Sequence, residues 1–121
     1  MNRGVPEDKE VTARIEREKK SAREKVSLKI LGYDYALSQE PVIGLENRGF
    51  FNAEVQTIRI AQEMSQQSKE ATVLHEIIHA LDFALAIDLS ETQVRQLEHG
   101  LYQVLTANGV SLSPLLIEYS K

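Results

Sequence analysis

The sequence predicts a small α+β domain, in which a sheet of about three antiparallel strands precedes two helices. The length of 121 residues and the 42% hydrophobic content suit one modest core. Short β-prone segments fill the middle of the chain, and helical periodicity dominates the last third. The chain has no cysteine, which excludes a disulfide framework and any thiolate metal ligand.

The N-terminal segment differs in composition from the rest of the chain. Residues 1–25 carry eight Lys and Arg against six Asp and Glu, with few apolar side chains, so they cannot bury much surface. We therefore expect a charged arm over residues 1–25, helical or disordered, and one domain over residues 26–121. The domain holds six basic against twelve acidic residues, which argues against a nucleic-acid partner.

Nothing in the sequence indicates a membrane segment. No apolar run approaches the roughly 20 residues that span a bilayer, and the charged N-terminus lacks the apolar region of a secretion signal. The absence of cysteine also fits a reducing compartment. We therefore expect a cytoplasmic protein without a membrane partner.

Two stretches predict the strands. VSLKILGYDYALS begins at Val26, and GFFNAEVQTIRIA follows after a break at Pro41 and Gly44. Asn52 is expected to begin a turn in the second stretch. The segment 56–61 alternates apolar Ile58 and Ile60 with polar neighbours, as a half-buried strand does.

The first helix is expected from Ser68 to Ala86. Apolar residues recur there at helical spacing and are predicted to face the core: Leu74, Ile77, Ile78, Leu81 and Leu85. Ser90 is expected to cap the second helix, with Gln93 completing a capping box. That helix should end at Asn108–Gly109. Its predicted inward residues are Val94, Leu97, Leu101, Val104 and Leu105. The apolar tail that follows should pack back on the domain.

The sequence His75-Glu76-Ile77-Ile78-His79 carries the candidate chemistry. Two histidines four residues apart on a helix point the same way and can bind one ion. Imidazole nitrogens suit tetrahedral zinc, although manganese, cobalt or nickel also accept such ligands. Glu76, rotated about 100° from His75, is positioned to act as general base toward a water that the ion activates.

The third protein ligand is ambiguous from the residues alone. Asp82 lies on the same helical face and is expected to accept a supporting hydrogen bond or to face solvent. Glu91 and Glu98 are seven residues apart, so they share one flank of the second helix and periodicity does not separate them. His99 points away from that flank and is expected on the surface.

The stretches VLHEIIHALD and LSETQVRQLEHGLYQVLTAN resemble small phage and prophage metallopeptidases related to the ImmA/IrrE group of gluzincins. The resemblance covers residues 26–112 and implies a minimal zincin-like fold. It also implies that the third ligand is Glu91, which opens a helix, although Val94, Arg95 and Glu98 differ from the residues of that group.

The resemblance implies further roles. A strand before the metal helix, here 56–61, would pair with an extended peptide substrate. Tyr102, Tyr33 and His99 are candidate donors to the oxyanion. The expected function is a zinc-dependent endopeptidase with a peptide or protein substrate, acting in phage or mobile-element regulation. The alternative is a non-catalytic, metal-containing module that binds a protein partner.

Overall fold

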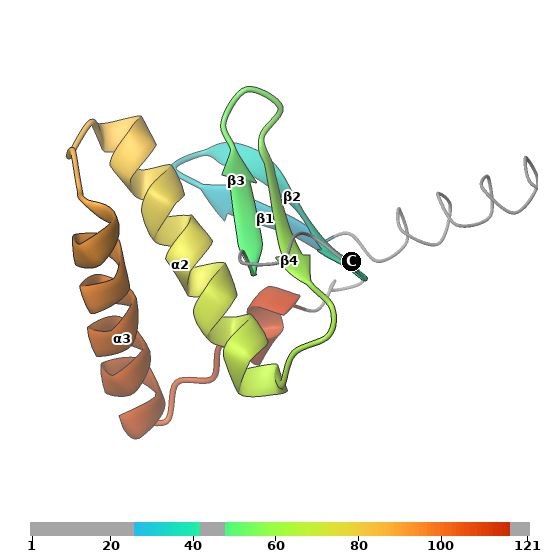
Figure 1. The fold of residues 1–121 in the computed structure, drawn as a ribbon, viewed down its shortest axis with the longest axis vertical. Coiled ribbons are helices and arrows are strands. Elements are labelled where there is room, and N and C mark those ends of the chain that lie inside the picture. The colour runs from blue at the N-terminus through green and yellow to red at the C-terminus, as the bar shows by residue number, and fades with distance from the viewer. Residues whose placement is uncertain (1–25, 42–47, 117–121) are drawn as a thin grey trace, which may run out of the picture.

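The computed structural model of the chain describes residues 26–41 and 48–116, so the expected arm over residues 1–25 lies outside it. The described part is an α+β fold. Its elements are β1 (Val26–Ile30), β2 (Tyr33–Glu40), β3 (Gly49–Asn52), β4 (Thr57–Ala61), α2 (Gln66–Leu85), α3 (Glu91–Ala107) and a 3₁₀ turn, η1 (Ser113–Leu116). Helix α2 lies across one face of the sheet, and α3 packs on the outer side of α2 (Figure 1).

The sheet is mixed, in the order β1-β2-β4-β3. Strands β1 and β2 form one antiparallel hairpin, and β3 and β4 form another. The two hairpins meet along a parallel seam between β2 and β4, where Ala36 pairs with Thr57 and Glu40 with Ala61. The expectation of about three antiparallel strands therefore missed one strand and the parallel pairing of β2 with β4, while the other two pairings are antiparallel as expected.

The turn between β1 and β2 explains the additional strand. Leu31 and Gly32 both have positive φ, at 51° and 86°, as the central residues of a two-residue hairpin turn do. Leucine is an unusual residue for that conformation, so the sequence gives a weak turn signal there. The turn predicted at Asn52 is confirmed, because its Oδ1 accepts the backbone N–H of Glu54 at 2.9 Å.

Helix α2 begins earlier than expected, because the Ser65 hydroxyl caps it by accepting the N–H of Ser68. It ends where Ala86 adopts the left-handed conformation, φ 53°. Leu74 and Ile78 are buried as predicted, and Ile77 and Leu81 are partly buried. The placement of Leu85 in the core was wrong: it is 57% exposed on the last turn of the helix.

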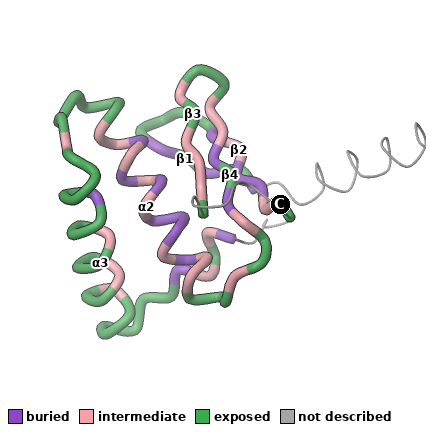
Figure 2. Tube along the Cα trace, in the orientation of Figure 1, coloured by how far each residue is buried: buried purple, intermediate pink, exposed green. Residues whose placement is uncertain are grey.

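Helix α3 has the predicted Ser90–Gln93 capping box, and Gly109 follows it with φ 81°. Val94 is fully buried and Leu105 is partly buried. The inward placement of the other three apolar residues was wrong, since they are exposed: Leu97, Leu101 and Val104. In the described part of the chain, α3 packs mainly on α2 through one edge of its apolar stripe, and most of α3 is exposed (Figure 2).

Two hydrophobic clusters hold these layers together. The larger joins the sheet to α2 and includes Leu37, Ile58, Ile60 and Val73. The smaller joins α2 to α3 and includes the buried Leu112, while Leu116 enters the larger one. The C-terminal segment thus packs back on the domain as expected, as far as Leu116. Among the described residues, no helix has both the length and the apolarity needed to cross a membrane.

Candidate metal centre and cleft

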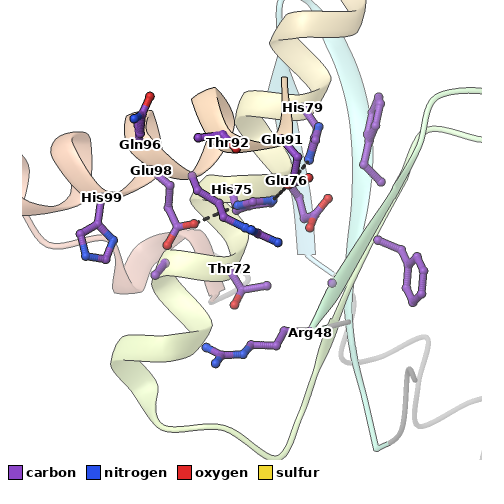
Figure 3. A pocket seen from close by; sticks show the side chains of 15 residues that line it. Arg48, Thr72, His75, Glu76, His79, Glu91, Thr92, Gln96, Glu98 and His99 are labelled. Atoms are coloured by element: carbon purple, nitrogen blue, oxygen red, sulfur yellow. Dashed lines mark hydrogen bonds and ion pairs between the residues drawn. The ribbon is translucent and has the colours of Figure 1, made fainter. Parts of the chain in front are cut away.

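An open cleft of about 1090 Å³ lies between β3 and α3, with α2 as its floor (Figure 3). Its lining contains all the residues that the sequence singled out as metal ligands or base: His75, Glu76, His79, Glu91 and Glu98. Helix α2 supplies the first three, and α3 supplies the two glutamates. The HExxH segment therefore lies in the middle of α2, with its polar residues facing the cleft.

His75, His79 and Glu91 form the one group of possible metal ligands found in the described residues. One ligand atom from each lies within 4.8 Å of the others. Glu91 Oε1 is 2.8 Å from His75 Nε2 and 3.4 Å from His79 Nε2. The one-turn spacing of the histidines brings their rings together, with centroids 4.9 Å apart. Glu91, the first residue of α3, reaches across to both.

This donor set fits a zinc ion. Ligands about 2.1 Å from a tetrahedral ion lie about 3.4 Å from each other. The distance between His79 Nε2 and Glu91 Oε1 has that value, and the distance to His75 Nε2 would open slightly. Two imidazoles and one carboxylate leave one position open, as catalytic zinc sites do. The two imidazole nitrogens disfavour calcium and magnesium, which are held by oxygen ligands.

Glu98 contacts the opposite nitrogen of His75. Its Oε1 lies 2.9 Å from His75 Nδ1, and its side chain is only 19% exposed. A carboxylate that accepts the Nδ1–H of a histidine fixes the tautomer whose Nε2 lone pair is free for a metal. The two glutamates that the sequence did not separate thus occupy different positions, Glu91 beside the Nε2 atoms and Glu98 behind His75 (Figure 3).

Glu76 lies beneath the edge of the sheet. It is 6% exposed, and no hydrogen bond to its carboxylate occurs among the described residues. A Cβ on Gly49 would come within 3.0 Å of Glu76 Oε2 and 2.9 Å of Thr72 Cγ2. Glycine at this position therefore lets β3 approach α2 closely enough to cover Glu76. The sequence analysis missed Gly49, because a close approach between distant segments leaves no local pattern.

The pKa values of Glu76 and Glu91 are shifted in opposite directions. Burial raises the pKa of Glu76, and this outweighs the lowering effect of His75 and His79. Burial also acts to raise the pKa of Glu91, but the charges and hydrogen bonds of the two histidines hold that pKa below its ordinary value. A carboxyl with a raised pKa suits proton transfer, and one with a lowered pKa suits metal ligation.

The link between the helices places Glu91. Asp82 Oδ1 accepts the backbone N–H of Leu89 at 2.9 Å, so this hydrogen bond goes to the link and not, as expected, to a candidate metal ligand. Ala86 and Asp88 both have positive φ, so the chain turns sharply before Ser90. Because the link is short and hydrogen-bonded to Asp82, α3 begins opposite His79. Asp82 supports the position of the third candidate ligand without contacting it.

Of the three candidate oxyanion donors, one lines the cleft and two do not. Tyr102 OH donates to the buried Glu70 at 2.9 Å, so it ties α3 to α2 outside the cleft lining. Tyr33 is 58% exposed at the start of β2 and also lies outside the lining. Neither tyrosine therefore lines the cleft. His99 does line the cleft, and in the view of Figure 3 Glu98 lies between it and His75.

The strand expected to pair with a substrate was also wrong. Strand β4 is flanked by β2 and β3, so its backbone groups are already paired. Among the described strands, β3 is the one whose outer edge is unpaired beside the cleft. Ala61 N–H donates to Arg48 O at 2.8 Å, and because antiparallel residues alternate in direction, Gly49 and Phe51 turn their backbone groups to the open edge.

No protein family, curated protein or solved structure was found to match the chain. The geometry of the cleft is therefore the basis for any functional assignment.

Proposed function

We propose that this chain is a zinc-dependent metallopeptidase, a minimal zincin-like enzyme in which His75, His79 and Glu91 hold the ion. The observation that carries the proposal is the convergence of these three donors beside a buried glutamate in one cleft. The resemblance of the HExxH segment and the following helix to the ImmA/IrrE gluzincins agrees with it. On that resemblance, the substrate is an intracellular protein with a regulatory role in a phage or mobile element.

The residues of the chain divide the chemistry between them. A zinc ion supplies a Lewis acid that polarises the scissile carbonyl and lowers the pKa of the attacking water. Glu76 accepts a proton from that water as the new C–O bond forms, and it delivers the proton to the leaving amine as the C–N bond breaks. Its raised pKa, caused by burial, suits both transfers.

Glu98 acts as a positioning residue. By accepting the Nδ1–H of His75 it holds the imidazole in the tautomer that ligates through Nε2. The free edge of β3 binds the substrate: the outward backbone groups of Gly49 and Phe51 pair with an extended peptide beside Glu76. Because Gly49 lies against Glu76, this pairing brings the peptide carbonyl close to the base.

Metal content and hydrolysis together test the proposal. Elemental analysis of the purified protein should give about one zinc per chain, and His79→Ala should remove it. His99→Ala is the matched control, because His99 lines the same cleft but lies outside the ligand group, and it should keep its zinc. Glu76→Gln should retain zinc and lose cleavage of a degenerate peptide mixture.

Three results would contradict the proposal. A wild-type protein that neither contains nor takes up zinc has no metal centre of this kind. Full peptide cleavage by Glu76→Gln would remove the proposed base. Zinc binding in the wild type without cleavage of any peptide would favour the non-catalytic binding module instead.

A further inference from the structure

Two arginines line the cleft from different sides. Arg48 immediately precedes β3, and Arg95 lies in the first half of α3. In Figure 3 the Arg48 side chain reaches from the start of β3 toward α2, below Thr72. Within residues 26–41 and 48–116, neither guanidinium forms an ion pair, whereas Arg59, which does not line the cleft, pairs with Glu40 at 3.2 Å.

The carboxylates that would ordinarily neutralise these arginines are turned to other partners. Arg95 lies four residues after Glu91 and three before Glu98, the spacings at which helical ion pairs form. Both glutamates contact His75 instead, at 2.8 Å and 2.9 Å. Glu76 is buried beneath Gly49. Among the described residues, no carboxylate therefore neutralises the two guanidinium groups of the cleft.

Arg48 lies next in sequence to the residue that covers Glu76. Its Cα lies about 3.8 Å from that of Gly49, the distance between any two consecutive residues. Gly49 in turn lies directly against Glu76. A group bound by the Arg48 or Arg95 side chain would therefore lie in the same cleft as Glu76. Guanidinium groups bind carboxylates with two parallel hydrogen bonds, a geometry that lysine does not offer.

We propose that Arg48 and Arg95 form a carboxylate-binding subsite, so that the preferred peptide carries a carboxylate beside the cleaved bond. The carboxylate is either an Asp or Glu side chain or the C-terminus of the peptide. This inference rests on the proposed peptidase function and names its class of substrate. In this proposal the two arginines select the substrate and take no part in breaking the bond.

Peptide pairs test the preference. The zinc-loaded protein is assayed on degenerate peptides in which one position is fixed as Glu or as Gln, each with a free or an amidated C-terminus. A charge-assisted bidentate contact gives roughly ten- to a hundredfold in kcat/KM for the carboxylate form. A preference for Glu over Gln assigns the site to a side chain, and a preference for the free over the amidated end assigns it to the C-terminus.

Variants that remove a positive charge show whether Arg48 and Arg95 cause the preference for a carboxylate. Arg48→Gln and Arg95→Gln should each bring the ratio of kcat/KM for the carboxylate and amide forms close to one, and Arg48→Lys should restore part of it. Lys29→Gln is the matched control, because it removes one positive charge from β1, outside the cleft lining, and should leave the ratio unchanged. An unaltered ratio in both arginine variants would overturn the subsite.

A binding measurement separates this proposal from the peptidase assignment. The Nε–Hε NMR signals of the two arginines are followed while N-acetylglutamate N-methylamide, N-acetylleucine or their neutral amides are added. Shifts with the carboxylates alone, in a protein that cleaves no peptide, would retain the subsite and reject the peptidase. Cleavage without any carboxylate preference would retain the peptidase and reject the subsite. Equal responses to carboxylates and amides would also reject the subsite.

Discussion

Glu98 and His75 are joined at 2.9 Å through Nδ1, the ring nitrogen that faces away from Glu91. One imidazole thus lies between two carboxylates that have different tasks. The arrangement predicts an order of effects on zinc affinity. Glu98→Ala should lower the affinity for zinc about 10- to 100-fold, as the loss of a supporting carboxylate does. Glu91→Ala removes a proposed ligand and should lower the affinity for zinc more than that.

Competition with a chromophoric chelator measures both affinities. Glu70→Gln is a suitable control, because Glu70 is a buried glutamate of α2 that contacts Gln66 and Tyr102 rather than a histidine. A larger loss in Glu98→Ala than in Glu91→Ala would reverse the assignment of ligand and positioning residue.

Two glycines should respond oppositely to alanine. In Gly49→Ala the new methyl group would meet Thr72 Cγ2 at 2.9 Å and the backbone oxygen of Arg59 at 3.2 Å. We expect a loss of about 1–3 kcal/mol in the free energy of unfolding, as overpacking causes. Gly100→Ala in α3 has open space around the new methyl group and should gain about 0.5–1 kcal/mol. Urea unfolding of the metal-free variants measures both, and equal effects would contradict the close approach of β3 to α2.

The burial of Glu76 predicts a pH-dependent stability. Because its folded pKa is raised above 4.5, the folded state binds more protons than the unfolded state between the two pKa values. The stability contributed by this group therefore falls as the pH rises through that window. Glu76→Gln lacks the buried charge and should unfold at a higher temperature than the wild type at pH 7.

Thermal unfolding with a chelator present tests this without interference from bound metal. The difference in unfolding temperature between Glu76→Gln and the wild type should shrink as the pH falls toward 4.5. An advantage that is independent of pH would show that the removed charge is not its source. Glu63→Gln, in the exposed segment before α2, controls for general changes in net charge.

The link between the helices gives a fourth prediction. Asp82→Ala removes the acceptor of the Leu89 N–H and should reduce the free energy of unfolding by about 1 kcal/mol. Because Leu89 lies two residues before Glu91, zinc affinity should also fall. Asp88→Asn removes the same charge from the link but keeps a residue that tolerates positive φ, so it should change neither quantity strongly. Zinc affinity that is unaffected in Asp82→Ala would show that the link does not position Glu91.

The sequence predicts the local parts of this molecule and misses the parts that depend on packing. Helical spacing alone put His75 and His79 on one face, and the capping box at Ser90 marked the start of α3. Periodicity did not separate Glu91 from Glu98, because only the position of α3 against α2 decides which nitrogen each one meets. Leu97 looks like a core residue by the same periodicity, yet no element of the described fold covers it.

The prediction of the sheet was wrong for a related reason. Alternation identified the strand containing Ile58 and Ile60, but it carries no information about which strand lies beside it. The pairing of Ala36 with Thr57 joins residues from different hairpins, and neither segment signals that neighbour. The approach of Gly49 to Glu76 depends on this same arrangement. Neither the position of β3 at the edge of the sheet nor its cover over Glu76 could therefore be predicted from local patterns.

The parallel seam between β2 and β4 has a consequence for the folding rate. Each hairpin forms from neighbouring residues and closes only a short loop, on a timescale of about 1–10 μs. The seam requires both hairpins to be formed and aligned, and it joins residues 21 positions apart, such as Ala36 and Thr57. We expect the docking of the two hairpins, rather than the formation of either one, to limit the rate of folding. Stopped-flow refolding as fast as hairpin formation would contradict this order.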